Sequence, residues 1–300
     1  MTAGNPFERD RIFIDELNEI AGGIDLQQTT LAAEAMYNGI GLHSGREVHM
    51  VLKPAPADTG LVFVRTDLEG QPQVRATAAN VTSTMRATTV EENGCRVFTI
   101  EHLMSAFHAL GVDNCYIEID AEEPPVADGS SLAFFQTMQA AGLVELSAER
   151  REIVVDQIYR IDDEENNRFV MVLPYDGFRV SFTSVNPHKL IGIQYENFEI
   201  SAKLYEKEIA PARTIAYEQE IEALRSMGLG LGGTLESVIV YNDEGWLNSL
   251  HFEDELVRHK ILDVIGDLRL AGPIRGHVIA VASGHALNTK LAKKLLENLG

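Results

Sequence analysis

The stretch Arg258-His-Lys-Ile-Leu-Asp-Val-Ile-Gly-Asp267 mixes charged and apolar residues in a pattern that predicts a buried helix with one functional face. In a helix, His259, Asp263 and Asp267 lie one turn apart on the same face, because side chains four residues apart overlie each other. Charged groups rarely occupy such an apolar helix without a partner. An imidazole and a carboxylate at this spacing can bind a divalent metal, whereas the simpler interpretation is a core histidine with solvated acids.

The composition indicates a soluble globular protein. Hydrophobic residues make up 45% of the 300 residues and charged residues 23%, and no apolar run approaches the roughly 20 residues that span a bilayer. The two cysteines, Cys95 and Cys115, are too few for a disulfide framework, and the N-terminus lacks the features of a secretory signal. A reduced, cytoplasmic protein is therefore expected. The net charge of −20 argues against nonspecific nucleic-acid binding.

Strand patterns followed by helical patterns occur twice along the chain, which predicts an α+β fold of two domains, each a sheet packed against a layer of helices. The first domain is expected at 28–150 and the second at 151–300, after an N-terminal arm, 1–27, with an amphipathic helix at Phe7–Ile20. No sequence repeat is strong enough to prove a duplication. The first strand is expected at Thr30–Tyr37, and the main helices are expected at 99–111, 131–141, 217–227, 254–270 and 286–299.

Glu101 and His102 are expected in the first turn of their helix, with Thr99 as its N-cap. Consecutive helical residues point about 100° apart, so one can bind a metal while the other faces a metal-bound water. With His259 and Asp263, His102 supplies three ligands and leaves a fourth position open, as in catalytic zinc sites. Taken alone, a glutamate in a first turn is more simply explained by favourable helix electrostatics.

His285, in Ser283-Gly-His285, is expected between a strand and a helix, where a loop side chain can reach a cleft. A loop histidine is more often an ordinary surface residue. Asp267 has no metal role on its helix, and pairing with it would keep His285 protonated near neutral pH. A cationic histidine opposite a carboxylate base is the kind of acid–base pair that hydrolysis uses.

Two glycine-rich runs fail as nucleotide-binding motifs. The run Gly228–Gly233 is not followed by Lys-Ser/Thr and does not follow a strand, so it is interpreted as a flexible or tightly turning loop. The run Gly39–Gly45 has no helix pattern after it and is interpreted as a turn, with His43 as a candidate ligand contact.

Together these motifs resemble the UDP-3-O-acyl-N-acetylglucosamine deacetylase family, the zinc amidases of lipid A synthesis. They occur in the family's order over roughly nine-tenths of the chain, which leaves little room for coincidence. The matching stretches are Gly39–Gly45, Thr99–Leu103, Asp113-Asn114, Asp128–Ser130, Ala212–Thr214, Gly232-Gly233, Phe252–Glu255, Arg258–Asp267 and Ser283–Asn288.

The resemblance implies an active site between the two domains, with zinc (Zn2+) bound by His102, His259 and Asp263. The metal would lower the pKa of a water molecule that attacks the acetamide carbonyl.

The resemblance also implies the roles of four further residues. Glu101 would be the general base, and the hydroxyl of Thr214 would stabilise the oxyanion together with zinc. His285, held by Asp267, would protonate the departing sugar amine or share its charge.

For the substrate, the resemblance implies that Lys260 contacts the diphosphate and that the insert at about 215–241 forms an apolar passage for the acyl chain. Two departures from the family pattern, Ile215 after Ala-Arg-Thr and Ala282 before Ser-Gly-His, affect details of substrate contact and leave the chemistry unchanged.

Two other functions stay open. One is an amidase of the same mechanism that acts on another N-acetyl sugar, and the other is a non-catalytic protein that binds a nucleotide sugar or a metal. The base Glu101 and the pair Asp267–His285 argue against binding alone. The apolar insert and Lys260 favour an acylated UDP-N-acetylglucosamine, and no protein partner is implied.

Overall fold

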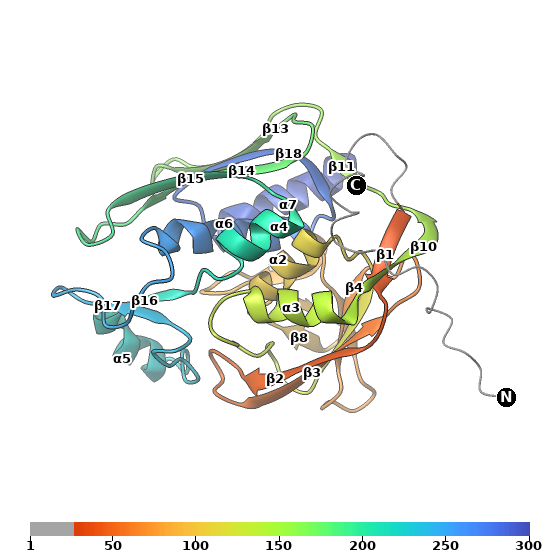
Figure 1. The fold of residues 1–300 in the computed structure, drawn as a ribbon, viewed down its shortest axis with the longest axis horizontal. Helices are drawn as coiled ribbons and strands as arrows, with labels where there is room; N and C mark the ends of the chain where they lie inside the picture. Colours follow the sequence, from red (N-terminus) through yellow and green to blue (C-terminus); the bar gives the residue numbers. More distant parts are fainter. Residues whose placement is uncertain (1–26) are drawn as a thin grey trace.

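The computed structural model describes residues 27–300, so the helix predicted at Phe7–Ile20 and nearly all of the predicted arm lie outside the described residues. The predicted α+β class is confirmed, because sheets and helices form separate layers (Figure 1). None of the helices between residues 27 and 300 is long and apolar enough to cross a membrane.

The first half of the chain forms a five-stranded sheet with two helices on one face (Figure 1). Buried residues alternate with more exposed ones, as in β3, where Val48, Met50 and Leu52 are buried. Across the sheet the strands are β2 (Ala35–Ile40), β3 (Glu47–Pro54), β9 (Cys115–Ile119), β4 (Leu61–Arg65) and β5 (Gln73–Arg75), and the helices are α2 (Glu101–Leu110) and α3 (Leu132–Ala141). The smaller elements are β1 (Gln27–Leu31) paired with β10 (Leu143–Glu149), the 3-10 helix η1 (Ala78–Asn80), and β6 (Val81–Ser83), β7 (Thr89–Glu92) and β8 (Cys95–Val97).

The second half forms a six-stranded sheet, again with helices on one face (Figure 1). Its strands are β12 (Tyr159–Asp163), β13 (Arg168–Leu173), β18 (Ile274–Val281), β14 (Phe178–Val185) and β15 (Ile193–Glu199) in spatial order, with β11 (Ile153–Val154) paired to β18. The helices are α6 (Glu255–Arg269) and α7 (His285–Leu299), and a short α4 (Ala202–Leu204) continues into the π-helix η2 (Tyr205–Ile209).

The two large sheets share one strand order. Leaving aside β11, which also pairs in parallel with β18, the fifth strand along the chain in each sheet lies between the second and the third. It is antiparallel to the second and parallel to the third. In each half one helix directly precedes this strand (α2 or α6) and one directly follows it (α3 or α7). The structure therefore shows a repeated topology that the sequence did not reveal, whereas the predicted domain boundaries stay a prediction.

The equivalent helices α2 and α6 pack against each other, and one hydrophobic core extends across both halves. The helices approach closely at Gly266, where an added Cβ would collide with the backbone carbonyl of Glu101. This approach brings the first turn of α2 beside the charged face of α6. The helices therefore bring the candidate ligands of the two halves together.

The insert predicted at 215–241 is bounded by two strands that pair in parallel, β16 (Ile215–Tyr217) and β17 (Ile239–Tyr241). Between them lies α5 (Glu218–Ser226), which has no buried residue and projects beside the main body (Figure 1). The predicted helix at 217–227 is thus confirmed.

Two local predictions were wrong. The strand expected at Thr30–Tyr37 is divided into β1 and β2, because the chain turns at 32–34 and β1 pairs with β10 instead of joining the five-stranded sheet. Thr99 is not the N-cap of α2. It has a left-handed φ of 55°, and its hydroxyl donates to Glu123, while Ile100 precedes the helix.

Candidate active site

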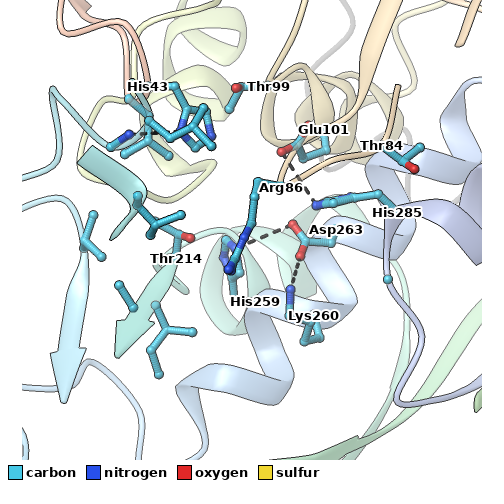
Figure 2. A pocket seen from close by; sticks show the side chains of 18 of the residues that line it. His43, Thr84, Arg86, Thr99, Glu101, Thr214, His259, Lys260, Asp263 and His285 are labelled. Carbon is cyan, nitrogen blue, oxygen red and sulfur yellow. Dashed lines mark hydrogen bonds and ion pairs between the residues drawn. The ribbon is translucent and has the colours of Figure 1, made fainter. Parts of the chain in front are cut away.

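A cavity of about 860 Å³ is lined by residues from both halves and from the insert (Figure 2). All but one of the predicted site residues line it. They are His43, Glu101, His102, Thr214, His259, Lys260, Asp263 and His285. The exception, Asp267, is fully buried behind His285.

His102, His259 and Asp263 are the one group among the described residues with the geometry for a metal ion. One ligand atom from each lies within 4.8 Å of the others. The Nε2 atoms of His102 and His259 are 3.7 Å and 3.5 Å from Oδ1 of Asp263. Two imidazole nitrogens and one carboxylate oxygen form a donor set that suits zinc and similar divalent ions, and they leave coordination positions free.

Further contacts orient these ligands from behind. The Nδ1 atom of His259 is 3.0 Å from the carbonyl oxygen of Ala212, which leaves Nε2 for a metal. The Lys260 ammonium donates to Oδ2 of Asp263 at 2.7 Å, whereas Oδ1 faces the histidines (Figure 2). Lys260 lines the cavity as predicted, but it also holds the carboxylate of a candidate ligand.

The protonation states of the three ligands suit a metal, which requires neutral imidazoles and an ionised carboxylate. Burial lowers the pKa of His102 to about 3 and also lowers the pKa of His259. Burial opposes the ionisation of Asp263, yet the positive charges of Lys260 and His285 outweigh it and hold the pKa of this carboxyl well below its usual range.

Glu101 lies in the same cavity on the first turn of α2. Its Oε2 accepts a hydrogen bond of 3.0 Å from the backbone N–H of Thr88, and its Oε1 is 3.9 Å from Nε2 of His285. Burial raises the pKa of Glu101 to about 7, with Asp267 and Asp263 adding to the rise and His285 opposing it. A carboxylate with such a pKa is suited to accept a proton near neutral pH.

His285 is the first residue of α7 and forms a hydrogen-bonded pair with Asp267, with 2.8 Å between Nδ1 and Oδ2. Asp267 also accepts from the Asn288 amide at 2.9 Å and from the Thr88 hydroxyl at 2.6 Å. Burial favours the neutral imidazole, but Asp267 and Glu101 outweigh it and raise the pKa of His285 to about 10. His285 is therefore a cation at neutral pH, and its Nε2 faces Glu101.

The sequence analysis missed three residues of this site. Thr88 joins the two halves, because its backbone donates to Glu101 and its hydroxyl donates to Asp267, 179 positions away. Nothing in the sequence signals this contact. Asn288 could have been found, since it lies three positions after His285 on the same helix. Arg86 also lines the cavity, and its Nη2 is 3.4 Å from Oε2 of Glu220 in α5.

The two glycine-rich runs contact each other at the rim of the cavity. The Gly232 N–H donates to the Leu42 carbonyl, and an added Cβ at Gly232 would collide with the carbonyl of Gly41. The Gly230 N–H donates to Nδ1 of His43 at 3.2 Å. The insert is therefore attached to the first half through His43, whose predicted role in binding a ligand stays a prediction.

Thr214 lines the cavity at the start of the insert. Its backbone is held on both sides, by the carbonyl of Gly129 and by the N–H of Ile239. Among the residues that the structure describes, no partner takes the Thr214 hydroxyl, so this group is free to donate into the cavity.

A two-histidine, one-aspartate group with open positions, beside a carboxylate base and a cationic histidine, is typical of metal-dependent hydrolases. The comparisons with known proteins agree with this class. The family model for UDP-3-O-acyl N-acetylglycosamine deacetylase matches residues 28–297. The chain therefore belongs to the UDP-3-O-acyl N-acetylglycosamine deacetylase family.

Individual relatives are similar along nearly the whole chain. Proteins named UDP-3-O-acyl-N-acetylglucosamine deacetylase from Marinobacter nauticus and Anaeromyxobacter dehalogenans are 42% and 43% identical to it. Each alignment covers 90% of this chain, and it covers 90% and 87% of the two relatives. The protein of this name from Hahella chejuensis is 42% identical over 280 residues. The family resemblance inferred from the motifs is thus confirmed.

Proposed function

We propose that this protein hydrolyses the acetamide of UDP-3-O-(3-hydroxyacyl)-N-acetylglucosamine, in the committed step of lipid A synthesis, and releases acetate and the free amine. Membership of the deacetylase family supports this assignment of the substrate. One observation carries the mechanism: Glu101 and His285 face each other in the same cavity as the candidate metal ligands. Because Cys95 and Cys115 are free and buried, we expect the reaction to take place in a reducing compartment, the cytoplasm.

We propose zinc as the metal, held by His102, His259 and Asp263. Two neutral imidazoles and one carboxylate with an open position form a donor set of catalytic zinc sites. When bound, zinc would supply Lewis-acid chemistry: it would lower the pKa of water and polarise the acetamide carbonyl.

The chain's own residues then move the protons. The Glu101 carboxylate accepts a proton from the attacking water, and its raised pKa suits this role near neutral pH. The Thr214 hydroxyl donates to the oxygen of the former carbonyl as negative charge develops there. The cationic His285, held at Nδ1 by Asp267, donates its Nε2 proton to the departing nitrogen, so the C–N bond breaks to give acetate and an amine.

The substrate would occupy the remainder of the cavity. Its apolar lining comes largely from the insert, and we propose that this part binds the acyl chain. The residues are Ile215, Ile221, Leu224, Leu229, Leu235, Val238 and Val240. Lys260 would contact the diphosphate, and Arg86 offers a second cation in the same cavity.

Acetate release from acylated UDP-N-acetylglucosamine, compared with the non-acylated form, tests this proposal. We expect turnover of the acylated substrate, loss of turnover on metal removal, and recovery with added zinc. Preference for a different N-acetyl sugar would establish the alternative amidase. Tight binding of the substrate without acetate release, by protein loaded with zinc, would establish the non-catalytic alternative.

A further inference from the structure

A second cavity, of about 340 Å³, lies at the C-terminal end of α6 and shares no lining residue with the active-site cavity. Its charged lining consists of four arginines and two aspartates, which makes it locally positive in a protein with a net charge of −20. These residues are Asp58, Arg75, Asp113, Arg150, Arg151 and Arg269.

Arg269, at the end of α6, is the innermost of these cations, with only 3% of its side chain exposed. Its Nη2 donates to the carbonyl of Val112 and is 3.4 Å from Oδ1 of Asp113. Its Nη1 is buried, and no residue between 27 and 300 provides it with a hydrogen-bond partner. A buried donor without a partner is costly, because its desolvation is not compensated.

Asp113 cannot neutralise the cations around it. Its Oδ1 is 3.1 Å from Nε of Arg150 and also faces Arg269, so one carboxylate forms ion pairs with two guanidinium groups. Arg75 and Arg151 are exposed, and neither forms an ion pair with a described residue. Burial lowers the pKa of Arg269 to about 10, and Arg150 contributes to this lowering, so the opposing effect of the shared Asp113 carboxylate does not offset the burial of this cation.

We propose that this cavity is a binding site for an oxyanion, held by Arg150 and Arg269 inside and by Arg75 and Arg151 at the mouth. Planar guanidinium groups match the geometry of phosphate and carboxylate oxygens, so a phosphate- or carboxylate-bearing ligand fits. The chain itself offers the same chemistry, because residues 1–26 contain six acidic side chains and precede Gln28, which lines the cavity.

Titration of the full-length protein with inorganic phosphate, followed by NMR of the arginine Nε–Hε groups, tests this site. Replacement of Arg269 could unfold the protein, so the test variant is the exposed pair Arg75→Gln/Arg151→Gln. Arg96→Gln is the matched control, because Arg96 is exposed and pairs with Glu91 and Glu122 away from the cavity. Deacetylase turnover reports correct folding of each variant.

We expect phosphate to shift the Arg150 and Arg269 signals in the wild type and in Arg96→Gln, with affinity lowered about tenfold or more in the double variant. In a second full-length variant, each of the six acidic residues among residues 1–26 is replaced by its amide, asparagine or glutamine. If phosphate binds only to this variant, the chain's own carboxylates occupy the site. Absence of phosphate binding both in the wild type and in this second variant, or equal phosphate affinity in all variants, would overturn the proposal.

Discussion

Gly266 of α6 lies directly against the backbone carbonyl of Glu101, the first residue of α2. This contact sets the distance between the two helices that carry the candidate metal ligands and the candidate base. A side chain at position 266 would separate them, although every functional group would remain.

Replacement of Gly266 by alanine should therefore destabilise the protein and weaken the site at once. We expect a loss of about 1–3 kcal/mol from overpacking, which outweighs the ~1 kcal/mol that alanine gains in helix propensity. Chemical denaturation of the metal-free protein measures the first effect, and metal titration measures the second. A variant as stable as the wild type, with unchanged metal affinity, would contradict this account of the helix contact.

Glu101→Gln should remove the base while leaving the metal ligands in place. We expect kcat to fall by about 10²–10⁴-fold with metal content unchanged. The pKa of Glu101 is about 7 without a metal, and the positive charge of a bound metal lowers it. In the metal-loaded wild type, kcat/KM should therefore rise with pH along a limb that lies below pH 7, as the carboxylate fraction of Glu101 grows. A Glu101→Gln enzyme with near wild-type turnover would exclude the base assignment.

Asp267→Asn should move the basic limb of the pH profile, at which activity falls as pH rises. In the proposed mechanism His285 donates a proton, so activity should fall as pH rises through its pKa of about 10. Asp267 is the main cause of this raised pKa, and its loss should shift the basic limb to lower pH. The acid limb should also move to lower pH but by less, because burial is the main cause of the raised pKa of Glu101 and Asp267 only adds to it. His285→Gln should remove the basic limb and most of the activity. An unaltered profile in Asp267→Asn would rule out the proposed support of His285.

Thr88→Val removes one of the two contacts of Thr88, a residue that the sequence analysis missed, and keeps the other. Valine keeps the backbone N–H that donates to Glu101 but loses the hydroxyl that donates to Asp267. We expect a stability loss of about 1–3 kcal/mol and a shifted basic limb, with the acid limb unchanged. Thr88→Ser should restore both properties. Failure of serine to do so would show that shape, and not the hydroxyl, matters at this position.

Lys260→Met tests the predicted contact with the diphosphate. We expect kcat/KM to fall more for the UDP-linked substrate than for an acylated N-acetylglucosamine without the diphosphate. Loss of the ion pair with Asp263 should lower kcat/KM equally for both substrates, so it cancels in the ratio of the two kcat/KM values. Metal content measured in parallel shows whether that ion pair is needed to hold the ion. Equal losses for both substrates would assign Lys260 to Asp263 alone.

The helices that carry the site could be predicted because their signals are local. In α6, the recurrence of His259, Asp263 and Asp267 at one-turn intervals is a property of neighbouring residues, and the structure begins and ends this helix within a residue of the prediction. The family motifs then placed these residues in one site with Glu101 and His285, and all five lie together.

Features that depend on distant pairing could not be predicted. The strand order of the sheets arises from contacts between segments far apart in the chain, and alternation within a strand does not say which strand is its neighbour. The division of Thr30–Tyr37 into β1 and β2 depends on such pairing with β10. Thr88 was missed for the same reason, since both of its partners are set by the packing of α2 on α6.

The repeated strand order gives the site an unusual position. Because α2 and α6 are equivalent helices, their contact lies where a symmetric homodimer would place its interface. In a homodimer both helices would carry identical residues, and any centre on the axis would be symmetric. Within a single chain the two copies are free to diverge. Helix α2 provides Glu101 and His102, and α6 provides His259, Asp263 and Asp267. The result is one asymmetric centre, in which the candidate base belongs to α2 and the candidate acid His285, from α7, is held by Asp267 of α6.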